Sequence, residues 1–497
     1  MVGEMLEKAR AYELEKEKEI AREERPLFHL TPRTGWMNDP NGFSRYGGKY
    51  HMFYQYHPYA SHWDSMHWGH AVSDDLLKWE YRPAALAPDE EYDSFGCFSG
   101  SAIDIEDGRQ LLMYTGVRVF TDDNGVRHEF QTQNIAIGDG VDYKKYENNP
   151  VITSEKIPEN ASKTDFRDPK IWRTEDGGYI AAIGSRPADG SGQILLYRSK
   201  DGFEWNYWKV LIANGCRYGK MWECPDFFKL DNKWVLLVSP QDMLAEGYEF
   251  INGNGTLCVI GDFDEKTGEF TAEHFQSIDY GIDFYAPQTV LSEDGRRLMI
   301  GWMQNWDACS IREGDAKWAG QMSMPRELFL KEGRLCQKPA KEIESLRGKK
   351  CEYHDVKIDK SISFEGINGR CLDIDIKVRP QDADGVYKSF EIRFAEDENF
   401  YTSLKFVPES GVLEIDRMHS GSRRALIHQR KSLVENSKNR ELELRVILDR
   451  YSAEIFVNGG EKVITTAIYT PLTAERVSFS ADGEASIDIT SYKLSTN

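Results

Sequence analysis

Short apolar runs alternate with polar turns over residues 28 to 335. Most runs span about four to eight residues, the usual length of a strand, and each turn places Gly or Asn beside charged residues. Two runs joined by such a turn predict a β-hairpin. The predicted hairpins pair 36–42 with 50–56, 99–103 with 111–115, 168–172 with 179–185, 223–228 with 234–239, and 285–289 with 298–302.

These hairpins begin roughly 55 to 70 residues apart, a long period that is typical of repeat architectures. A further strand, an acidic turn and an outer strand follow four of them, at 72–79, 137–143, 198–205 and 260–264. About four strands per repeat are what the blades of a β-propeller require, and radial closure leaves few exposed sheet edges. We therefore predict an all-β chain with a five-bladed β-propeller over residues 28–337.

The flanking segments have other patterns. Residues 1–27 are dense in Glu, Lys and Arg with apolar residues at helical spacing, and they predict one helical extension laid against the first blades. Residues 338–350 are polar and helix-prone and form the predicted linker. Strict alternation of apolar and polar residues over 351–497 predicts a C-terminal antiparallel β-sandwich. We favour a sandwich that packs on the propeller and stabilises it over one that binds carbohydrate.

Composition narrows the class of partner. The chain of 497 residues has 62 Lys and Arg against 82 Asp and Glu, and its net charge of −20 disfavours nucleic acid and anionic membranes. Its 12% aromatic content suits a small saccharide, although solubility alone accounts for the acidic balance. The chain shows no apolar run of about 18 residues and no apolar signal core, so we expect a cytoplasmic protein. The oligomeric state is open, a homo-oligomer included.

The heads of the five repeats carry the candidate chemistry. Equivalent positions of a radial repeat lie on one ring, so Asp39, Ser99, Asp168, Glu223 and Tyr285 are expected to converge about the central axis. Three of them are carboxylates. Two carboxylates about 5.5 Å apart repel by about 3 kcal/mol, or roughly two pKa units, so one member is expected to be protonated near neutral pH.

Paired carboxyl groups in opposite protonation states are what glycoside hydrolysis with retention requires. One attacks the anomeric carbon, and the other protonates the leaving oxygen. Any one of the three alone would more often be a turn residue that accepts backbone N–H bonds. A carboxylate-held metal is the competing functional interpretation. It is disfavoured because no Asp-x-Asp-x-Asp loop occurs and His67 and His70 have poor spacing for a shared ligand face. The eight cysteines contain no Cys-x-x-Cys pair, so we expect reduced thiols.

Seven ordered sequence blocks resemble glycoside hydrolase family 32, which includes invertases, fructan hydrolases and sucrose-6-phosphate hydrolases. The blocks are HLTPRTGWMNDPNG at 29–42, FYQY at 53–56, HWGHA at 67–71, FSGSA at 98–102, FRDP at 166–169, MWECPD at 221–226 and DFYAPQ at 283–288. The resemblance is strong over 28–335 and weak over the sandwich. It implies the same propeller and sandwich that the repeats predict.

The resemblance also implies residue roles. Asp39 is expected to be the nucleophile, Glu223 the general acid/base, and Asp168 the group that binds fructosyl hydroxyls and stabilises the transition state. The remaining expected substrate-binding residues are Asn38, Gln55, Trp63, Phe98, Ser99, Arg167, Tyr285 and Trp302.

Two further residues stand near these motifs. His57 precedes Pro58 where the family commonly carries Asn, and we expect a turn residue near the mouth of the pocket, with a role in leaving-group specificity as the alternative. Cys224 is expected to be a packed, unreactive neighbour that excludes water.

The sequence therefore predicts a retaining glycosidase without metal or cofactor. It would release terminal β-D-fructosyl units from sucrose, sucrose 6-phosphate or short fructo-oligosaccharides by double displacement. An exo-acting fructan hydrolase for inulin or levan is the alternative within the class. A non-catalytic carbohydrate-binding protein on the same fold is the alternative outside it. The preferred leaving group stays open.

Overall fold

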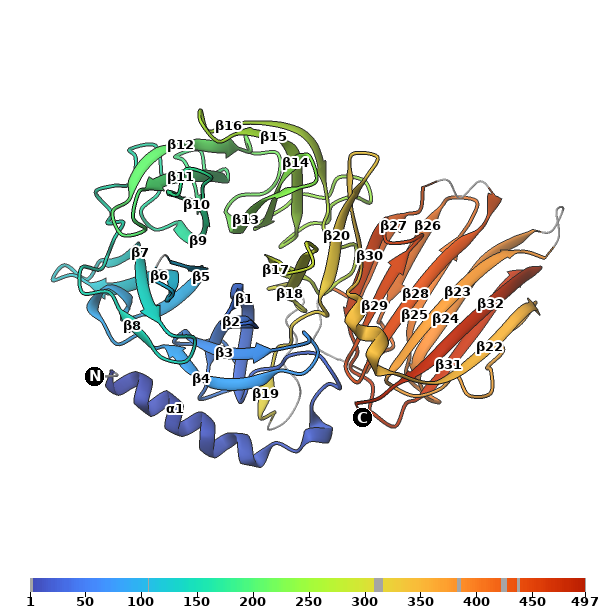
Figure 1. The fold of residues 1–497 in the computed structure, drawn as a ribbon. Coiled ribbons are helices and arrows are strands. Elements are labelled where there is room, and N and C mark those ends of the chain that lie inside the picture. Colours follow the sequence, from blue (N-terminus) through green and yellow to red (C-terminus); the bar gives the residue numbers. More distant parts are fainter. Residues whose placement is uncertain are drawn as a thin grey trace.

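The computed structural model describes residues 3–105, 107–307, 316–381, 386–421, 427–435 and 439–496. Most of these residues lie in β-strands. The strands gather into five small sheets arranged in a ring, with two larger sheets beside it (Figure 1). We call residues 35–339 the ring and residues 347–494 the C-terminal unit.

The ring contains all five predicted hairpins and their outer strands. The first sheet has β1 (Gly35–Tyr46), β2 (Lys49–His57), β3 (His67–Ser73) and β4 (Glu80–Leu86). The second has β5 (Gly96–Asp104), β6 (Gln110–Thr121), β7 (Arg127–Gly138) and β8 (Tyr143–Lys145). The third has β9 (Phe166–Arg173), β10 (Tyr179–Ser185), β11 (Gln193–Ser199) and β12 (Asn206–Ala213). The fourth has β13 (Trp222–Leu230), β14 (Lys233–Pro240), β15 (Leu257–Asp264) and β16 (Glu269–Gln276). The fifth has β17 (Tyr285–Leu291), β18 (Arg297–Trp302), β20 (Arg326–Lys331) and β21 (Arg334–Pro339).

The innermost strands of the five sheets follow one another round the ring. β1 contacts β5 and β17, β9 contacts β5 and β13, and β13 contacts β17. The Ser101 hydroxyl donates a hydrogen bond from β5 to Pro169 O of the neighbouring strand β9 (2.7 Å), and Gln288 Nε2 of β17 reaches past β1 to Gly100 O of β5 (2.8 Å). The short strand β19 (Trp318–Ala319) adds to the first sheet parallel to β1. The heads of the repeats are thereby brought to the centre of the ring.

One hairpin is longer than the sequence pattern indicated. The apolar run was expected to end at Thr115, but β6 stays paired with β7 as far as the Thr121–Arg127 pair. The extension carries Val117, Val119 and Phe120 on β6, and the ring of Phe120 stacks on that of Phe130 of β7 at 6.0 Å, so apolar residues continue past the expected end. It matters for function because it carries Glu129 and Gln131 to the central cavity.

The N-terminal extension is helical over a shorter stretch than predicted. Helix α1 covers Glu4–Lys16, and two 3-10 turns, η1 (Glu17–Glu19) and η2 (Arg22–Glu24), replace its expected continuation. Ile20 between them is extended and buried, which turns the chain back toward β1. The helix lies against the first sheet as expected, since Glu13 Oε1 accepts Ala84 N at 2.9 Å. None of the helices that the structure describes is long and apolar enough to span a bilayer.

The predicted linker is largely structured. The 3-10 helices η3 (Glu91–Asp93) and η4 (Lys341–Leu346) lie outside the sheets, and η4 occupies the middle of the predicted linker. Strand β22 (Arg347–Ile358) then begins inside the predicted linker, because its first residues pair with β32, as in Arg347 opposite Leu494. The C-terminal unit therefore starts before residue 351.

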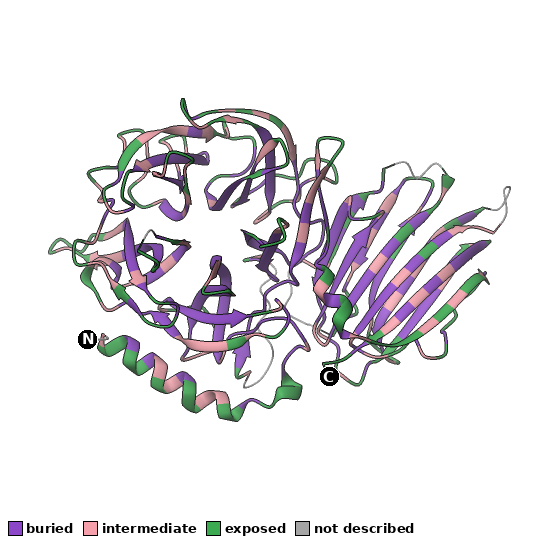
Figure 2. Ribbon diagram, viewed as in Figure 1, coloured by how far each residue is buried: buried purple, intermediate pink, exposed green. Residues whose placement is uncertain are grey.

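The C-terminal unit consists of two antiparallel sheets that enclose one apolar core. Buried and exposed residues alternate along its strands (Figure 2). In the six-stranded sheet the strands lie in the order β22, β32 (Ala485–Leu494), β23 (Leu372–Pro380), β28 (Leu442–Asp449), β29 (Ser452–Val457) and β30 (Lys462–Ala467). In the five-stranded sheet the order is β27 (Gln429–Leu433), β26 (Val412–Asp416), β25 (Thr402–Val407), β24 (Tyr387–Glu396) and β31 (Arg476–Gly483).

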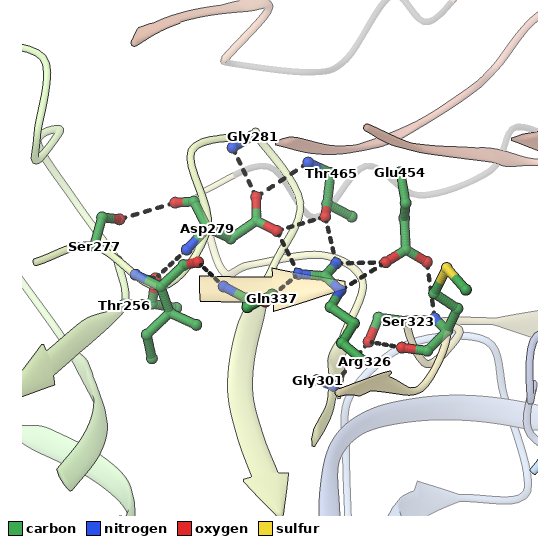
Figure 3. A network of polar contacts seen from close by, with 12 residues as sticks. Thr256, Ser277, Asp279, Gly281, Gly301, Ser323, Arg326, Gln337, Glu454 and Thr465 are labelled. Carbon is green, nitrogen blue, oxygen red and sulfur yellow. Dashed lines mark hydrogen bonds and ion pairs between the residues drawn. The ribbon is translucent and has the colours of Figure 1, made fainter. Parts of the chain in front are cut away.

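A buried polar network joins the ring to the C-terminal unit (Figure 3). Arg326 of β20 is fully buried and binds Asp279 of the ring (2.8 Å) and Glu454 of the C-terminal unit (Nε to Oε2, 2.9 Å). His29 extends the network, because its ring nitrogens lie 2.8 Å from Asp449 and 2.9 Å from Glu454. Charges buried so deeply are tolerated only when paired, so the two parts are held in one geometry.

Candidate active site

A cavity of about 520 Å³ opens at the centre of the ring and holds most of the predicted site residues. A larger groove of about 920 Å³ lies at the β9–β10 and β11–β12 turns of the third sheet and contains none of them. The central cavity is lined by Asn38, Asp39, Gln55, Trp63, Phe95, Phe98, Ser99, Glu129, Gln131, Thr164, Asp165, Arg167, Asp168, Glu223, Gln241, Asn254 and Trp306.

Each innermost strand breaks its register at the head of its repeat. In the third, fourth and fifth sheets the break follows one pattern: Asp168, Cys224 and Ala286 each precede Pro and have positive φ (65°, 50° and 51°). A β-bulge of this kind re-aims the neighbouring side chains. Positive φ is uncommon for residues other than Gly, so its recurrence at the same position of three sheets indicates that the fold requires this backbone conformation there.

The bulges correct the predicted phase of the repeat. Arg167, Glu223 and Tyr285 are the last paired residues before the three bulges, opposite Gly184, Ser239 and Trp302. Glu223 therefore corresponds to Arg167 and not to Asp168. Asp168 and Glu223 were expected to occupy equivalent positions of two repeats, because an apolar pattern does not show where a bulge lies.

Asp39 lies deep in the cavity and is only 9% exposed. Its Oδ2 accepts hydrogen bonds from Ser99 Oγ (3.0 Å) and Cys224 Sγ (3.4 Å). Its Oδ1 is buried and has no hydrogen-bond partner among the described residues. Burial raises the pKa of Asp39 to about 6, the charge of Glu223 adds to this rise, and the side chains of Asn38 and Ser99 oppose it.

Asp168 lies beside Asp39 and shares Cys224 with it. The Cys224 backbone N–H donates to Asp168 Oδ2 (2.9 Å), and the Cys224 thiol lies 3.6 Å from the same oxygen. Burial raises the pKa of Asp168, and the Arg167 charge opposes this rise. Burial also keeps the pKa of the Cys224 thiol well above its ordinary value, so this residue is a packed thiol as expected.

Glu223 is held at both carboxylate oxygens. Arg167 donates to Oε1 from Nε (3.1 Å) and Nη2 (3.0 Å), and the Tyr285 hydroxyl lies 2.7 Å from Oε2. Arg167 also binds Asp165 Oδ1 at 3.0 Å. One carboxyl group was expected to be protonated near neutral pH. The carboxyl groups whose pKa is raised are those of Asp39 and Asp168, whereas Glu223 forms an ion pair with Arg167.

The remaining predicted residues divide into lining and supporting groups. Asn38 Oδ1 accepts a hydrogen bond from Trp36 Nε1 (2.8 Å), and Gln55 Nε2 donates one to Cys97 O (3.0 Å). The rings of Trp63 and Phe98 meet edge to face at 6.1 Å on the cavity wall.

Two of the predicted aromatic residues lie behind the wall. Trp302 is fully buried, and its ring centroid lies 4.9 Å from that of Trp306. The aromatic face at the cavity on this side is therefore Trp306. Tyr285 reaches the site through its hydroxyl alone.

Sequence reasoning missed several lining residues because they come from loops and from the long β6–β7 hairpin. Of these residues, Asp165 could most readily have been predicted, since it directly precedes the FRDP block. Trp306 follows Trp302 by four residues and offered a second signal. The missed residues are Phe95, Glu129, Gln131, Thr164, Asp165, Gln241, Asn254 and Trp306.

Comparison with known proteins gives one consistent result. The family models "Glycosyl hydrolases family 32 N-terminal domain" and "Glycosyl hydrolases family 32 C terminal" match residues 29–339 and 342–495. The chain is 37% identical over 470 residues to a raffinose invertase of Escherichia coli, with 93% of each chain covered. It is 36% identical over 467 residues to a sucrose-6-phosphate hydrolase of Escherichia coli, covering 91% of this chain and 90% of the other.

Solved structures agree. A β-fructofuranosidase of Bombyx mori matches with a TM-score of 0.83 and 35% identity over 98% of both chains. A sucrose-6-phosphate hydrolase of Lactobacillus gasseri matches with a TM-score of 0.84 and 27% identity over 97% of this chain and 96% of that one. The chain belongs to glycosyl hydrolases family 32 and is a glycosidase of the β-fructofuranosidase type.

Proposed function

We propose that the chain hydrolyses sucrose and short fructo-oligosaccharides at a terminal β-D-fructosyl unit, with retention of configuration. The observation that carries this proposal is the convergence of Asp39, Asp168 and Glu223 in one cavity with Asp39 Oδ1 unpartnered. We further propose that the ring is a five-bladed β-propeller and the C-terminal unit a β-sandwich, with the boundary between them at η4.

Asp39 is suited to be the nucleophile. Ser99 and Cys224 fix its Oδ2 and leave Oδ1 to attack the anomeric carbon of the fructosyl unit. The attack forms a covalent glycosyl ester and expels the leaving-group oxygen. Because the carboxylate is pre-oriented by two donors, little reorganisation is needed at the moment of reaction.

Glu223 is suited to protonate the leaving oxygen and later to take a proton from water. The Tyr285 hydroxyl lies 2.7 Å from Glu223 Oε2 and 3.0 Å from the Ser239 carbonyl. It can donate a hydrogen bond to an ionised Glu223, or it can accept a hydrogen bond from the neutral Glu223 carboxyl while donating its own to the Ser239 carbonyl. The pair therefore accommodates both protonation states that a general acid/base must pass through.

Asp168 is suited to bind the fructosyl hydroxyls. The bulge aims its carboxylate at the centre of the ring, where Cys224 N–H fixes one oxygen. A negative charge at this point favours the positive charge that develops on the sugar ring in the transition state.

The charges of the cavity favour a neutral substrate over a phosphorylated one. Arg167 is the only basic residue among the described residues that line it, and Glu223 and Asp165 already engage its guanidinium. The acidic lining residues are Asp39, Glu129, Asp165, Asp168 and Glu223. A phosphate dianion would meet like charge here and no unpaired cation among these residues.

Two experiments test the function and the substrate separately. Asp39→Asn should leave the fold unchanged by circular dichroism and lower sucrose hydrolysis about 10⁴-fold or more. Turnover near that of the wild type would remove Asp39 from its role. The second experiment compares kcat/KM for sucrose, raffinose and sucrose 6-phosphate, because the last two carry a neutral and an anionic substituent on the same glucose oxygen.

We expect raffinose to be cleaved and sucrose 6-phosphate to be disfavoured at least about tenfold against sucrose, or about 1.4 kcal/mol. A tenfold preference for the phosphorylated sugar would overturn the neutral-substrate proposal without touching the roles of the carboxylates. A cytoplasmic location, the oligomeric state and the independence from cofactors stay predictions.

A further inference from the structure

Three metal-binding side chains meet at one place that the proposed chemistry does not use. His57 ends β2, and His62 and Asp64 lie on the loop that leads to β3. One potential ligand atom from each residue lies within 4.8 Å of the other two. We propose that His57, His62 and Asp64 bind one divalent transition-metal ion, with Zn²⁺ as the best fit, beside the cavity mouth.

His57 already has the tautomer that a ligand needs. Its Nδ1 lies 3.2 Å from the Ser65 carbonyl, which can only accept, so Nδ1 carries the proton and Nε2 keeps its lone pair. Metal-binding histidines commonly donate their second ring nitrogen to a backbone carbonyl in this way. His67 Nδ1 lies 3.0 Å from the same carbonyl, which further fixes Ser65 and the ring of His57. His57 is buried, so the arrangement is held by packing.

Asp64 and His62 are exposed and complete the donor set. Asp64 Oδ1 accepts the Ser65 N–H at 2.7 Å, which orients the carboxylate and leaves Oδ2 as its ligand atom. Two imidazoles and one carboxylate, with a fourth position for water, form a donor set that Zn²⁺ takes in proteins. With bonds of about 2.0–2.1 Å the ligand atoms must come to roughly 3.4 Å apart. Rotation of the two exposed side chains can supply this contraction.

The site bears on catalysis through Trp63. Trp63 lies between the two exposed ligands in the chain, lines the cavity and meets Phe98 edge to face. An ion bound by His62 and Asp64 would restrict the motion of the loop that carries Trp63. The Trp63 side of the cavity wall would then be ordered before the sugar binds. By linkage, bound sugar would raise ion affinity to the same degree. This coupling rests on the proposed function, whereas the ion site does not.

The test uses the full chain after treatment with chelator. Zn²⁺ is titrated by calorimetry, and Co²⁺ is added separately to read the visible absorption of a low-coordinate site with nitrogen and oxygen ligands. We expect one ion per chain. His62→Ala and Asp64→Asn, both on the exposed loop, should each weaken binding at least about tenfold. His128→Ala is the matched control, because His128 also faces a carboxylate, Asp122, at 2.9 Å on a different hairpin.

Two results would overturn the ion site: no stoichiometric binding to the wild type, or equal binding to the wild type, His62→Ala and Asp64→Asn. The second result would place the ion elsewhere, for example on the exposed Cys216. The coupling has its own readout. Zn²⁺ should lower KM for sucrose in the wild type and leave it unchanged in His62→Ala. An unchanged KM in the wild type overturns the coupling, and a sucrose-inactive enzyme that still binds Zn²⁺ overturns the proposed function alone.

Discussion

Arg167 donates two hydrogen bonds to one oxygen of Glu223, from Nε at 3.1 Å and from Nη2 at 3.0 Å, and the two residues hold the same register position in neighbouring strands of the ring. The guanidinium therefore pairs directly with Glu223, and its charge also opposes the rise in the pKa of Asp168, so it offsets part of the repulsion among the carboxyl groups. This is why the ring can hold three carboxyl groups in one small cavity.

Loss of the acid should depend on the leaving group. Glu223→Gln keeps the size of the side chain and removes its proton transfer, so sucrose hydrolysis should fall by about 10²–10⁴-fold. An aryl fructoside, whose leaving group needs no proton, should lose far less. Steady-state rates on both substrates provide the measurement, with Glu129→Gln as a control carboxylate of the same cavity. Equal losses on the two substrates would contradict the acid role.

The hydroxyl of Tyr285 should matter through Glu223. Tyr285→Phe removes the contact to Glu223 Oε2 and the bond to the Ser239 carbonyl. We expect kcat for sucrose to fall about tenfold to hundredfold, since one hydrogen bond to a charged group contributes about 1.5–3 kcal/mol. Tyr197→Phe is a suitable control, because its hydroxyl bonds to Lys156 O away from the cavity. A wild-type kcat in Tyr285→Phe would remove this hydroxyl from the mechanism.

The acidic limb of the pH profile should report Asp39. The nucleophile must be ionised, and its pKa is raised to about 6, so kcat/KM should fall as the pH drops below about 6. Ser99→Ala removes a hydrogen bond that stabilises the carboxylate, which raises the pKa further and moves the limb to higher pH. Profiles of kcat/KM between pH 4.5 and 7.5 test both statements; a limb at the same pH in the variant would assign it to another group.

The contact between the two parts should weaken in alkali. Burial by itself lowers the pKa of His29, but the hydrogen bonds and charges of Asp449 and Glu454 together raise it to about 9 in the folded state, against 6.5 in the unfolded chain. A raised pKa gives stability that is complete below pH 6.5 and is lost as the pH rises through 9. The loss is on the order of 3 kcal/mol.

His29→Gln tests this assignment. The variant should unfold at lower urea concentration than the wild type at pH 6, and the difference should shrink toward pH 9. His128→Gln, at an exposed surface pair, serves as the control. If the free energy of unfolding changed with pH equally in the wild type and in His29→Gln, the assignment would be refuted.

Local structure was predictable where the signal is local. The turn at Gly47 and Gly48 and the apolar run after it predict the first hairpin, because turn chemistry and alternation act over a few residues. The extension of β6 and β7 was missed, although Val117, Val119 and Phe120 continue the apolar run past Thr115 and Phe120 stacks on Phe130 across the hairpin. The end of α1 at Lys16 was hidden, because the charged, helix-favouring sequence continues beyond it while Ile20 is extended and buried.

The sequence alone determined the hairpins, their period and the presence of an acidic residue at the head of three of them. Tertiary structure decided which of these residues meet. Arg167 and Glu223 are 56 positions apart, and His29 and Glu454 are 425 apart, so only closure of the ring and docking of the C-terminal unit bring each pair into contact. The bulges set the register positions of Arg167 and Glu223, and the period of the apolar residues along the chain does not reveal an extra residue in one strand.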